Sequence, residues 1–287
     1  MDDDGKVIPF GVRNVDRMLG GGVPAGSMVL LTTENGAGGR EFAHTMLAQQ
    51  SLAKHSPDKY EVKNQELRDK HKIPHEIHYL SLVRKPQDIL RDTSSILTER
   101  QQEIFDSEVD MLDISDSYFS NTIVPKNWFS NRDITFDSLE QESQTLDTIS
   151  RLTTFIDRNA EDNTVFIDSL NDLFEATEGH LEWSELLVFL KGLARKSMDW
   201  EGVIITALNK DTVSEQKYKA VSNIFDGIIE FKWDEEQEGS QRRTTMQIER
   251  FRGIMSSMGS EAKNMYETEA RKGGLRVRKI ESLKHEG

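Results

Sequence analysis

The sequence predicts an α/β fold, in which helices cover both faces of a mostly parallel sheet and an antiparallel extension follows at the C-terminal end. Short apolar runs rich in β-branched residues alternate with longer segments whose apolar residues recur at helical spacing. This alternation is typical of βαβ units. After Asp226 the alternation stops, and apolar runs follow one another with only polar stretches between them. Such runs predict antiparallel strands.

Nearly continuous apolar runs predict the strands of the parallel sheet, because strands buried on both faces carry few polar residues. In chain order the expected strands are Ser27–Thr33, Ile77–Leu82, Val109–Ile114, Thr164–Leu170 and Gly202–Leu208. The segments with helical spacing are Arg40–Lys54, Ser143–Ala160 and Leu181–Ser197.

Antiparallel strands are expected in the C-terminal part of the chain. Gly227–Trp233 and Thr244–Phe251 flank the polar turn Asp234–Arg243, which predicts a hairpin. A last strand, Gly274–Ile280, is expected at the sheet edge after the polar linker Ser256–Asn264.

These patterns predict a core over residues 1–253, followed by a C-terminal linker and edge strand over 254–287. Two segments interrupt the core pattern. The segment at about 56–74 is highly charged, and the one at about 120–142 is polar and aromatic, so both are expected to be surface insertions.

Acidic residues outnumber basic ones, with 50 Asp plus Glu against 36 Lys plus Arg and a net charge of −14. Such a surface repels nucleic acid and anionic membranes, so neither is expected as a partner. Acidic excess also suits a protein of a halophilic cytoplasm. The chain has no cysteine, which excludes disulfides, thiolate zinc sites and cysteine nucleophiles. With no leader pattern and no long apolar stretch, the sequence predicts a cytoplasmic location.

A glycine-rich loop, T-E-N-G-A-G-G-R-E-F, follows the first expected strand. Backbone N–H groups in such a loop, and the helix N-terminus after it, favour phosphate. The complete phosphate-binding pattern is G-x-x-x-x-G-K-[ST]. With Gly38 as the second glycine, Thr33 stands at the first glycine, Gly39 at the lysine and Arg40 at the hydroxyl residue, while Gly36 lies within the loop. By itself the loop fits a ligand-free turn equally well.

Five segments in order carry a family resemblance. They read FGVRNVDRMLGGGVPAGSMVLL, YLSLVRKPQDI, VFIDSLNDL, GVIITALN and IERFRG, and they are distributed over most of the range Pro9–Gly253. This order resembles the KaiC-like branch of the RecA superfamily of P-loop ATPases. The chain is also similar to degenerate KaiC-like proteins of salt-loving archaea, which are described as implicated in signal transduction. The resemblance implies a RecA-like P-loop core and ATP as the ligand of its family, while the residues leave open whether ATP binds here.

The resemblance also implies which catalytic parts are missing. ATP hydrolysis needs a cation on the γ-phosphate, a magnesium ion and a group that activates water. Gly39 replaces the lysine and Arg40 replaces the magnesium-binding hydroxyl. Val83 and Arg84 stand where the family has adjacent glutamates. No catalytic residue is therefore expected.

Asp168 matches the carboxylate of the Walker B strand, and we expect it to bind a magnesium-coordinated water, to cap the next helix or to pair with Arg40. The other candidate partner of Arg40 is a bound phosphate. A closed loop held by the Arg40–Asp168 pair is favoured, because a buried carboxylate without its metal needs a counter-charge. Arg250 and Arg252 match a basic pair that reaches a neighbour's phosphates in the family. Two exposed charges beside an inward-facing Phe251 fit them equally well.

No metal site is expected. His71, His75 and His78 lie close together, but a proline and a strand start interrupt their spacing, so we expect solvated side chains.

Three functions remain open from the sequence. The first is a catalytically degenerate regulatory or signal-transduction protein that binds a protein partner or its own copies, as a homo-oligomer. The second is an ATP-binding protein with slow or partner-assisted hydrolysis. The third is a DNA recombination or repair accessory, against which the acidic charge counts. The replaced residues count against hydrolysis but not against nucleotide binding.

Overall fold

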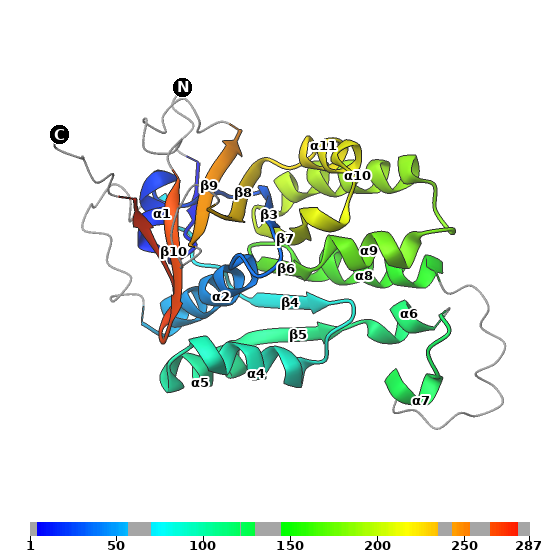
Figure 1. Ribbon diagram of the computed structural model, residues 1–287, viewed down its shortest axis with the longest axis horizontal. Coiled ribbons are helices and arrows are strands. Elements are labelled where there is room, and N and C mark those ends of the chain that lie inside the picture. Colours follow the sequence, from blue (N-terminus) through cyan, green and yellow to red (C-terminus); the bar gives the residue numbers. More distant parts are fainter. Residues whose placement is uncertain are drawn as a thin grey trace.

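The computed structural model of the chain describes residues 5–56, 70–120, 122–129, 145–234, 243–252 and 265–280. Within these residues, nine strands form one sheet in the order β11-β10-β9-β8-β3-β7-β6-β4-β5 (Figure 1). The strands of the parallel part are β3 (Met28–Thr33), β4 (Ile77–Ser81), β5 (Val109–Asp113), β6 (Thr164–Asp168), β7 (Val203–Asn209) and β8 (Gly227–Trp233). The antiparallel strands are β9 (Thr244–Phe251), β10 (Tyr266–Arg271) and β11 (Gly274–Lys279).

The strand pairings confirm the predicted fold class. Strands β8, β3, β7, β6, β4 and β5 pair in parallel, and β9 turns back on β8 with Trp233 opposite Thr244. Each of the five predicted parallel strands is present, with ends that differ from the predicted ones by a few residues. The parallel strands inside the sheet are largely buried on both faces, which explains their nearly continuous apolar sequences, whereas the edge strand β5 buries only Val109 fully.

Helices cover the sheet in two layers (Figure 1). One layer consists of α1 (Arg13–Met18), α2 (Gly39–His55), α4 (Pro86–Ile96) and α5 (Glu99–Glu108). The other consists of α8 (Thr145–Asn159), α9 (Leu170–Thr177), α10 (Trp183–Trp200) and α11 (Glu215–Ser222). Each layer packs its own apolar core against one face, the first around Phe42 and Phe105 and the second around Leu173 and Leu190.

The remaining elements are short. A separate two-stranded sheet pairs β1 (Val7–Ile8) with β2 (Val23–Pro24), and α6 (Ser115–Phe119), α7 (Lys126–Phe129) and the 3-10 helix η3 (Lys210–Thr212) connect larger elements. In the described part of the chain, none of the helices combines the length and apolar character needed to cross a bilayer.

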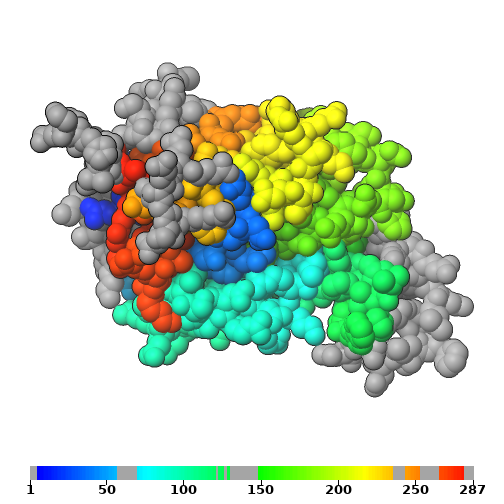
Figure 2. All heavy atoms as spheres, viewed as in Figure 1, coloured from blue at the N-terminus to red at the C-terminus, as the bar shows by residue number. Residues whose placement is uncertain are grey.

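The C-terminal hairpin adds a strand that the sequence pattern did not indicate. Only Gly274–Ile280 was expected as a strand, yet β10 pairs with both β9 and β11 and extends the sheet. Leu275 N donates to Thr45 Oγ1 of α2 at 2.8 Å. Figure 2 shows this hairpin, in red, on the surface of the molecule next to the segment that carries α4 and α5. The C-terminal strands therefore share the core of the preceding chain.

Some predictions fall largely outside the described residues. These are most of the 56–74 and 120–142 insertions, the centre of the Asp234–Arg243 turn and the Ser256–Asn264 linker.

Candidate functional site

The glycine-rich loop joins the carboxyl end of β3 to the N-terminus of α2, as the sequence predicts. Gly36 and Gly38 adopt φ angles of 74° and 100°, a region that side chains with a Cβ rarely enter. Gly38 is the N-cap of α2, and Phe42 N donates to its carbonyl at 2.9 Å. The loop closes on itself through a bond from Ala37 N to Glu34 O at 3.0 Å.

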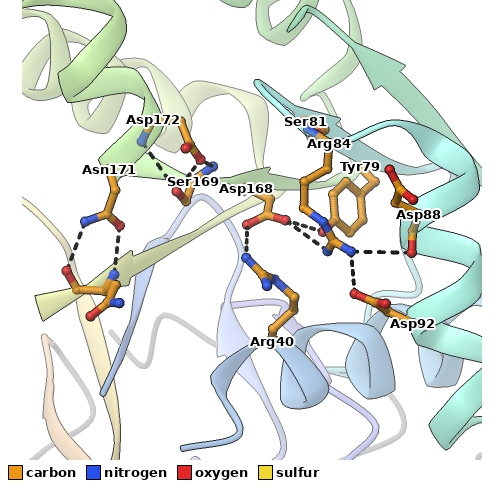
Figure 3. Close-up of polar contacts among 11 residues, drawn as sticks. Arg40, Tyr79, Ser81, Arg84, Asp88, Asp92, Asp168, Ser169, Asn171 and Asp172 are labelled. Carbon is orange, nitrogen blue, oxygen red and sulfur yellow. Dashed lines mark hydrogen bonds and ion pairs between the residues drawn. The ribbon is translucent and has the colours of Figure 1, made fainter. Parts of the chain in front are cut away.

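Asp168 ends β6 at the centre of the site, with its side chain 2% exposed. Among the described residues, three side chains contact its carboxylate, one each from α2, β4 and the turn after β4 (Figure 3). Tyr79 Oη donates to Oδ2 at 2.6 Å, Arg40 Nη2 lies 3.5 Å from Oδ1, and Arg84 Nη1 lies 3.8 Å from Oδ2. The expected Arg40–Asp168 pair is thus present, and Arg84 and Tyr79 are partners that the sequence did not indicate.

Sheet pairing explains why Tyr79 and Arg84 reach Asp168. Strand β4 lies beside β6, with Ser81 opposite Asp168. Arg84 follows β4 in a turn in which its backbone N–H donates to Ser81 Oγ at 2.9 Å. The Arg84 guanidinium also contacts the Asp92 carboxylate on α4. It therefore bridges two carboxylates, at the position where the resemblance implies a catalytic glutamate.

Burial and charge shape the pKa values around Asp168. Burial lowers the pKa of Arg40, but Asp168, Tyr79 and Glu41 together raise it by more, so the net shift is upward. Burial and then the negative charge of Asp168 raise the pKa of Tyr79 well above its ordinary value. Both groups keep their protons at neutral pH, so Arg40 stays a cation and Tyr79 stays a hydrogen-bond donor. A cation in the first turn of a helix is unfavourable, and the Asp168 carboxylate offsets this.

His44 lies one turn along α2 from Arg40 and is 2% exposed. Its ring contacts those of Tyr79 and Phe105, with centroid separations of 5.9 and 6.4 Å. Burial, opposed by Asp168 and reinforced by Arg40 and Arg84, lowers the pKa of His44 to about 4. The imidazole is therefore neutral at pH 7.

Hydrogen bonds fix the other wall of the site (Figure 3). Ser169 is the N-cap of α9, and its N–H donates to Asp172 Oδ2 at 3.0 Å in a capping box. Asn171 then joins α9 to the end of β7, because its amide both donates to Asn209 O and accepts from Asn209 N. These bonds hold the ends of β6 and β7 in fixed positions beside the loop.

A cavity of about 460 Å³ lies between the loop, α4 and the ends of β6 and β7. Its volume is within the range of small-molecule sites. Among the described residues, the charged side chains on its walls are four carboxylates and one guanidinium, namely Glu34, Glu41, Asp92, Asp168 and Arg40.

Arg250 and Arg252 lie away from this cavity and contact their own chain. The Arg250 guanidinium donates to the carbonyls of Ser222 and Phe225, and that of Arg252 donates to Asn223 O. Phe251 between them is buried, as the alternation predicts. The role of this pair across a subunit boundary remains a prediction.

Two of the three neighbouring histidines differ from the expectation of solvated side chains. His71 is half-buried with its Nε2 buried, and of the three only His75 is exposed. His78 is buried on β4, with Nδ1 3.2 Å from Asp110 Oδ2 on the adjacent strand β5. Its side chain is not solvated because β4 lies between β6 and β5 in the sheet, and Phe155 packs against its ring. Among the described residues, no group of three or more histidines and carboxylates is arranged to hold a metal ion.

The residues present do not fit magnesium–ATP as the P-loop pattern binds it. The pattern needs an ammonium at position 39 and a hydroxyl at position 40, and the chain has glycine and arginine there. The Asp168 carboxylate already has two guanidiniums and a phenol as partners. No step of ATP hydrolysis follows from this geometry.

Comparisons with known proteins bear on the fold. No protein-family model matches the chain, and a search of curated proteins found no match. Among solved structures, a KaiC-like protein from the hyperthermophilic archaeon Pyrococcus horikoshii OT3 is similar, with a TM-score of 0.59 and 15% sequence identity. The alignment covers 95% of this chain and 99% of the other. With the sheet order, this similarity shows that the chain has the fold of that KaiC-like protein.

Proposed function

We propose that this chain is a catalytically degenerate KaiC-like protein that acts in regulation or signal transduction by binding a protein partner or its own copies. One observation supports the loss of catalysis above the others. The side chains at the positions of the magnesium hydroxyl and of the catalytic glutamate, Arg40 and Arg84, are both cations, and both lie against Asp168. Mg²⁺ needs an oxygen ligand at the first of these positions. Hydrolysis needs a group that orients or activates water at the second.

The charge of the cavity also supports the loss of ATP turnover. A nucleotide triphosphate carries several negative charges, and phosphate sites balance them with cations and backbone N–H groups. Here four carboxylates face one guanidinium, and that guanidinium is paired with Asp168. One loop N–H, that of Asn35, donates to the Asp211 carboxylate at 3.2 Å. These features disfavour a polyanion in the cavity.

A steady-state ATPase assay with magnesium tests the loss of catalysis. We expect phosphate release at background, equal for the native chain and for an Asp168→Ala variant. Turnover by the native chain that is well above that of Asp168→Ala would contradict the proposal. Adding Thr33→Trp as a second control separates turnover at this site from that of a contaminating ATPase.

The second candidate, an ATP-binding protein without efficient hydrolysis, is favoured by the size of the cavity beside the loop. The two candidate functions predict different melting temperatures in the presence of ATP. Regulation without nucleotide predicts an unchanged melting temperature in ATP, with or without magnesium. An ATP-dependent rise in melting temperature that Arg40→Ala abolishes would favour the second candidate, since ligand binding to the folded state raises stability.

A further inference from the structure

At position 33 this chain has threonine where the P-loop pattern has glycine, and at position 39 it has glycine where the pattern has lysine. A steric contact links the two differences. A Cβ placed on Gly39 would lie 2.9 Å from Thr33 Cβ and 3.2 Å from Thr33 Oγ1. Carbon atoms that are not bonded to each other optimally lie about 3.5–4.0 Å apart. The side chain at position 33 thus occupies the space in which any side chain at position 39 would begin.

A change of rotamer cannot relieve the contact between Thr33 Cβ and a Cβ at position 39. The position of a Cβ atom is fixed by the backbone, so changing the rotamer of Thr33 moves Oγ1 but leaves Cβ in place. The backbone of Thr33 is held on both sides, opposite Asn209 of β7 and Phe231 of β8. On the other side, Phe42 in the first turn of α2 is fully buried, and its N–H is bonded to Gly38.

We propose that Thr33 is the specificity-determining residue of this loop, because it excludes every side chain from position 39 and with it the lysine that a nucleotide site requires. The P-loop pattern has glycine, which carries no side chain, at the position of Thr33, and lysine at position 39. In this chain the side chain is at position 33 and the glycine at position 39, so replacing Gly39 with lysine alone cannot restore a nucleotide site. The inference deepens the proposed function and rests on it for its biological meaning.

A double-mutant cycle on stability tests the contact without any nucleotide. Gly39 begins α2 and its φ is not in the left-handed region, so alanine there should be favourable in the absence of a clash. We expect Gly39→Ala to lower the melting temperature when Thr33 is present and to raise it in a Thr33→Gly background. The sign of the effect should therefore reverse between the two backgrounds.

Thr33→Ala is the matched control, because it removes Oγ1 and the methyl group but keeps the Cβ that makes the 2.9 Å contact. We expect Gly39→Ala to remain destabilising in the Thr33→Ala background. Equal effects of Gly39→Ala in all three backgrounds would overturn the proposal. These variants change the chain by few atoms, and urea titration of each confirms that it unfolds cooperatively.

Nucleotide binding gives a second readout. The Gly39→Lys/Arg40→Ser variant is compared with the variant that carries Thr33→Gly as well. We expect magnesium–ATP to raise the melting temperature of the second only. An equal response of both variants, including no response of either, would overturn the assignment of Thr33. ATPase activity of the native chain would instead contradict the proposed function and leave the Thr33–Gly39 coupling unaffected.

Discussion

At the scale of single residues, Asp168 is held by partners of unequal strength. Arg84 is 20% exposed and contacts both Asp92 and Asp168, whereas Arg40 is 51% exposed and contacts Asp168 alone at 3.5 Å. Ion pairs weaken with exposure, because water screens them and long side chains lose entropy on pairing. Arg84 should therefore contribute more to stability than Arg40.

Replacing each arginine with methionine, which keeps most of the aliphatic stem, tests this order. We expect Arg84→Met to lower the free energy of unfolding by about 2 kcal/mol, since it leaves two carboxylates short of a partner. Arg40→Met should cost about 1 kcal/mol or less. Arg91→Met is the control, because Arg91 is 76% exposed and forms a surface pair with Asp88. Urea denaturation measures the free energy of unfolding of all three variants. Equal losses for Arg40→Met and Arg84→Met would contradict the larger contribution of Arg84.

The lowered pKa of His44 predicts that the free energy of unfolding depends on pH. Its pKa falls from 6.5 in the unfolded chain to about 4 in the folded protein, chiefly because of burial. Between these values the unfolded chain binds the proton and the folded protein does not, so stability rises with pH. On lowering the pH from 7 to 4, we expect His44 to remove on the order of 3 kcal/mol from the free energy of unfolding.

The difference between the native chain and a His44→Gln variant isolates this contribution. The native curve should fall more steeply than the variant curve between pH 6.5 and 4, and the two should run parallel above pH 7. His180→Gln, a change at an exposed histidine, should leave the native slope unaltered. Parallel curves for the native chain and His44→Gln over the whole range would show that His44 is not buried in the neutral form.

At the scale of secondary-structure elements, Arg250 of β9 and Arg252 just after it bind the C-terminal end of α11. Their guanidiniums donate to carbonyls at and just beyond the last turn, where the helix dipole favours cations. We expect Arg250→Ala to lower the free energy of unfolding by about 1–2 kcal/mol, because hydrogen bonds from a charged donor to part-buried carbonyls are lost. Arg276→Ala, at an exposed position of β11, should change it by less than about 0.5 kcal/mol. Thermal unfolding of both variants measures the difference, and equal stabilities would contradict the capping role.

The comparison of sequence and structure also belongs to this scale. The buried parallel strands and the long helices were predictable, because a continuous apolar run or a helical repeat needs no knowledge of neighbours. Strand β10 was missed since its sequence, Y-E-T-E-A-R, carries three charges, although its alternation of Tyr266 and Thr268 with glutamates is a strand signal. The contact of Tyr79 with Asp168 was not predictable, because it depends on β4 lying beside β6 rather than on local spacing.

At the scale of the whole molecule, self-association through the face that carries Arg250 and Arg252 remains a prediction. The bonds of both side chains within their own chain mean that Arg252→Ala affects stability as well as any interface. Sedimentation must therefore be read together with thermal unfolding. We expect a salt-dependent oligomer for the native chain that Arg252→Ala weakens while the variant stays folded. A monomer at low and high salt alike would contradict association.

The net charge of −14 predicts that salt stabilises the protein. Like charges repel one another more in the compact folded state than in the expanded unfolded chain, so net charge lowers stability. Raising the ionic strength from 0.1 to 1 M shortens the Debye length from about 10 to about 3 Å and removes most of this repulsion. We expect sodium chloride to raise the melting temperature by roughly 2–4 °C over this range, which corresponds to about 1–2 kcal/mol for a chain of this length.

A variant with fewer charges separates repulsion from a general salt effect. Replacing Glu103, Asp106, Glu161 and Glu178, which are all exposed, with their amides removes four negative charges and leaves −10. If repulsion is the cause, this variant melts at a higher temperature than the native chain in low salt and gains less from added salt. Preferential exclusion of salt from the protein surface would instead raise both melting curves by the same amount. Equal salt slopes would therefore assign the stabilisation to the solvent rather than to the acidic surface.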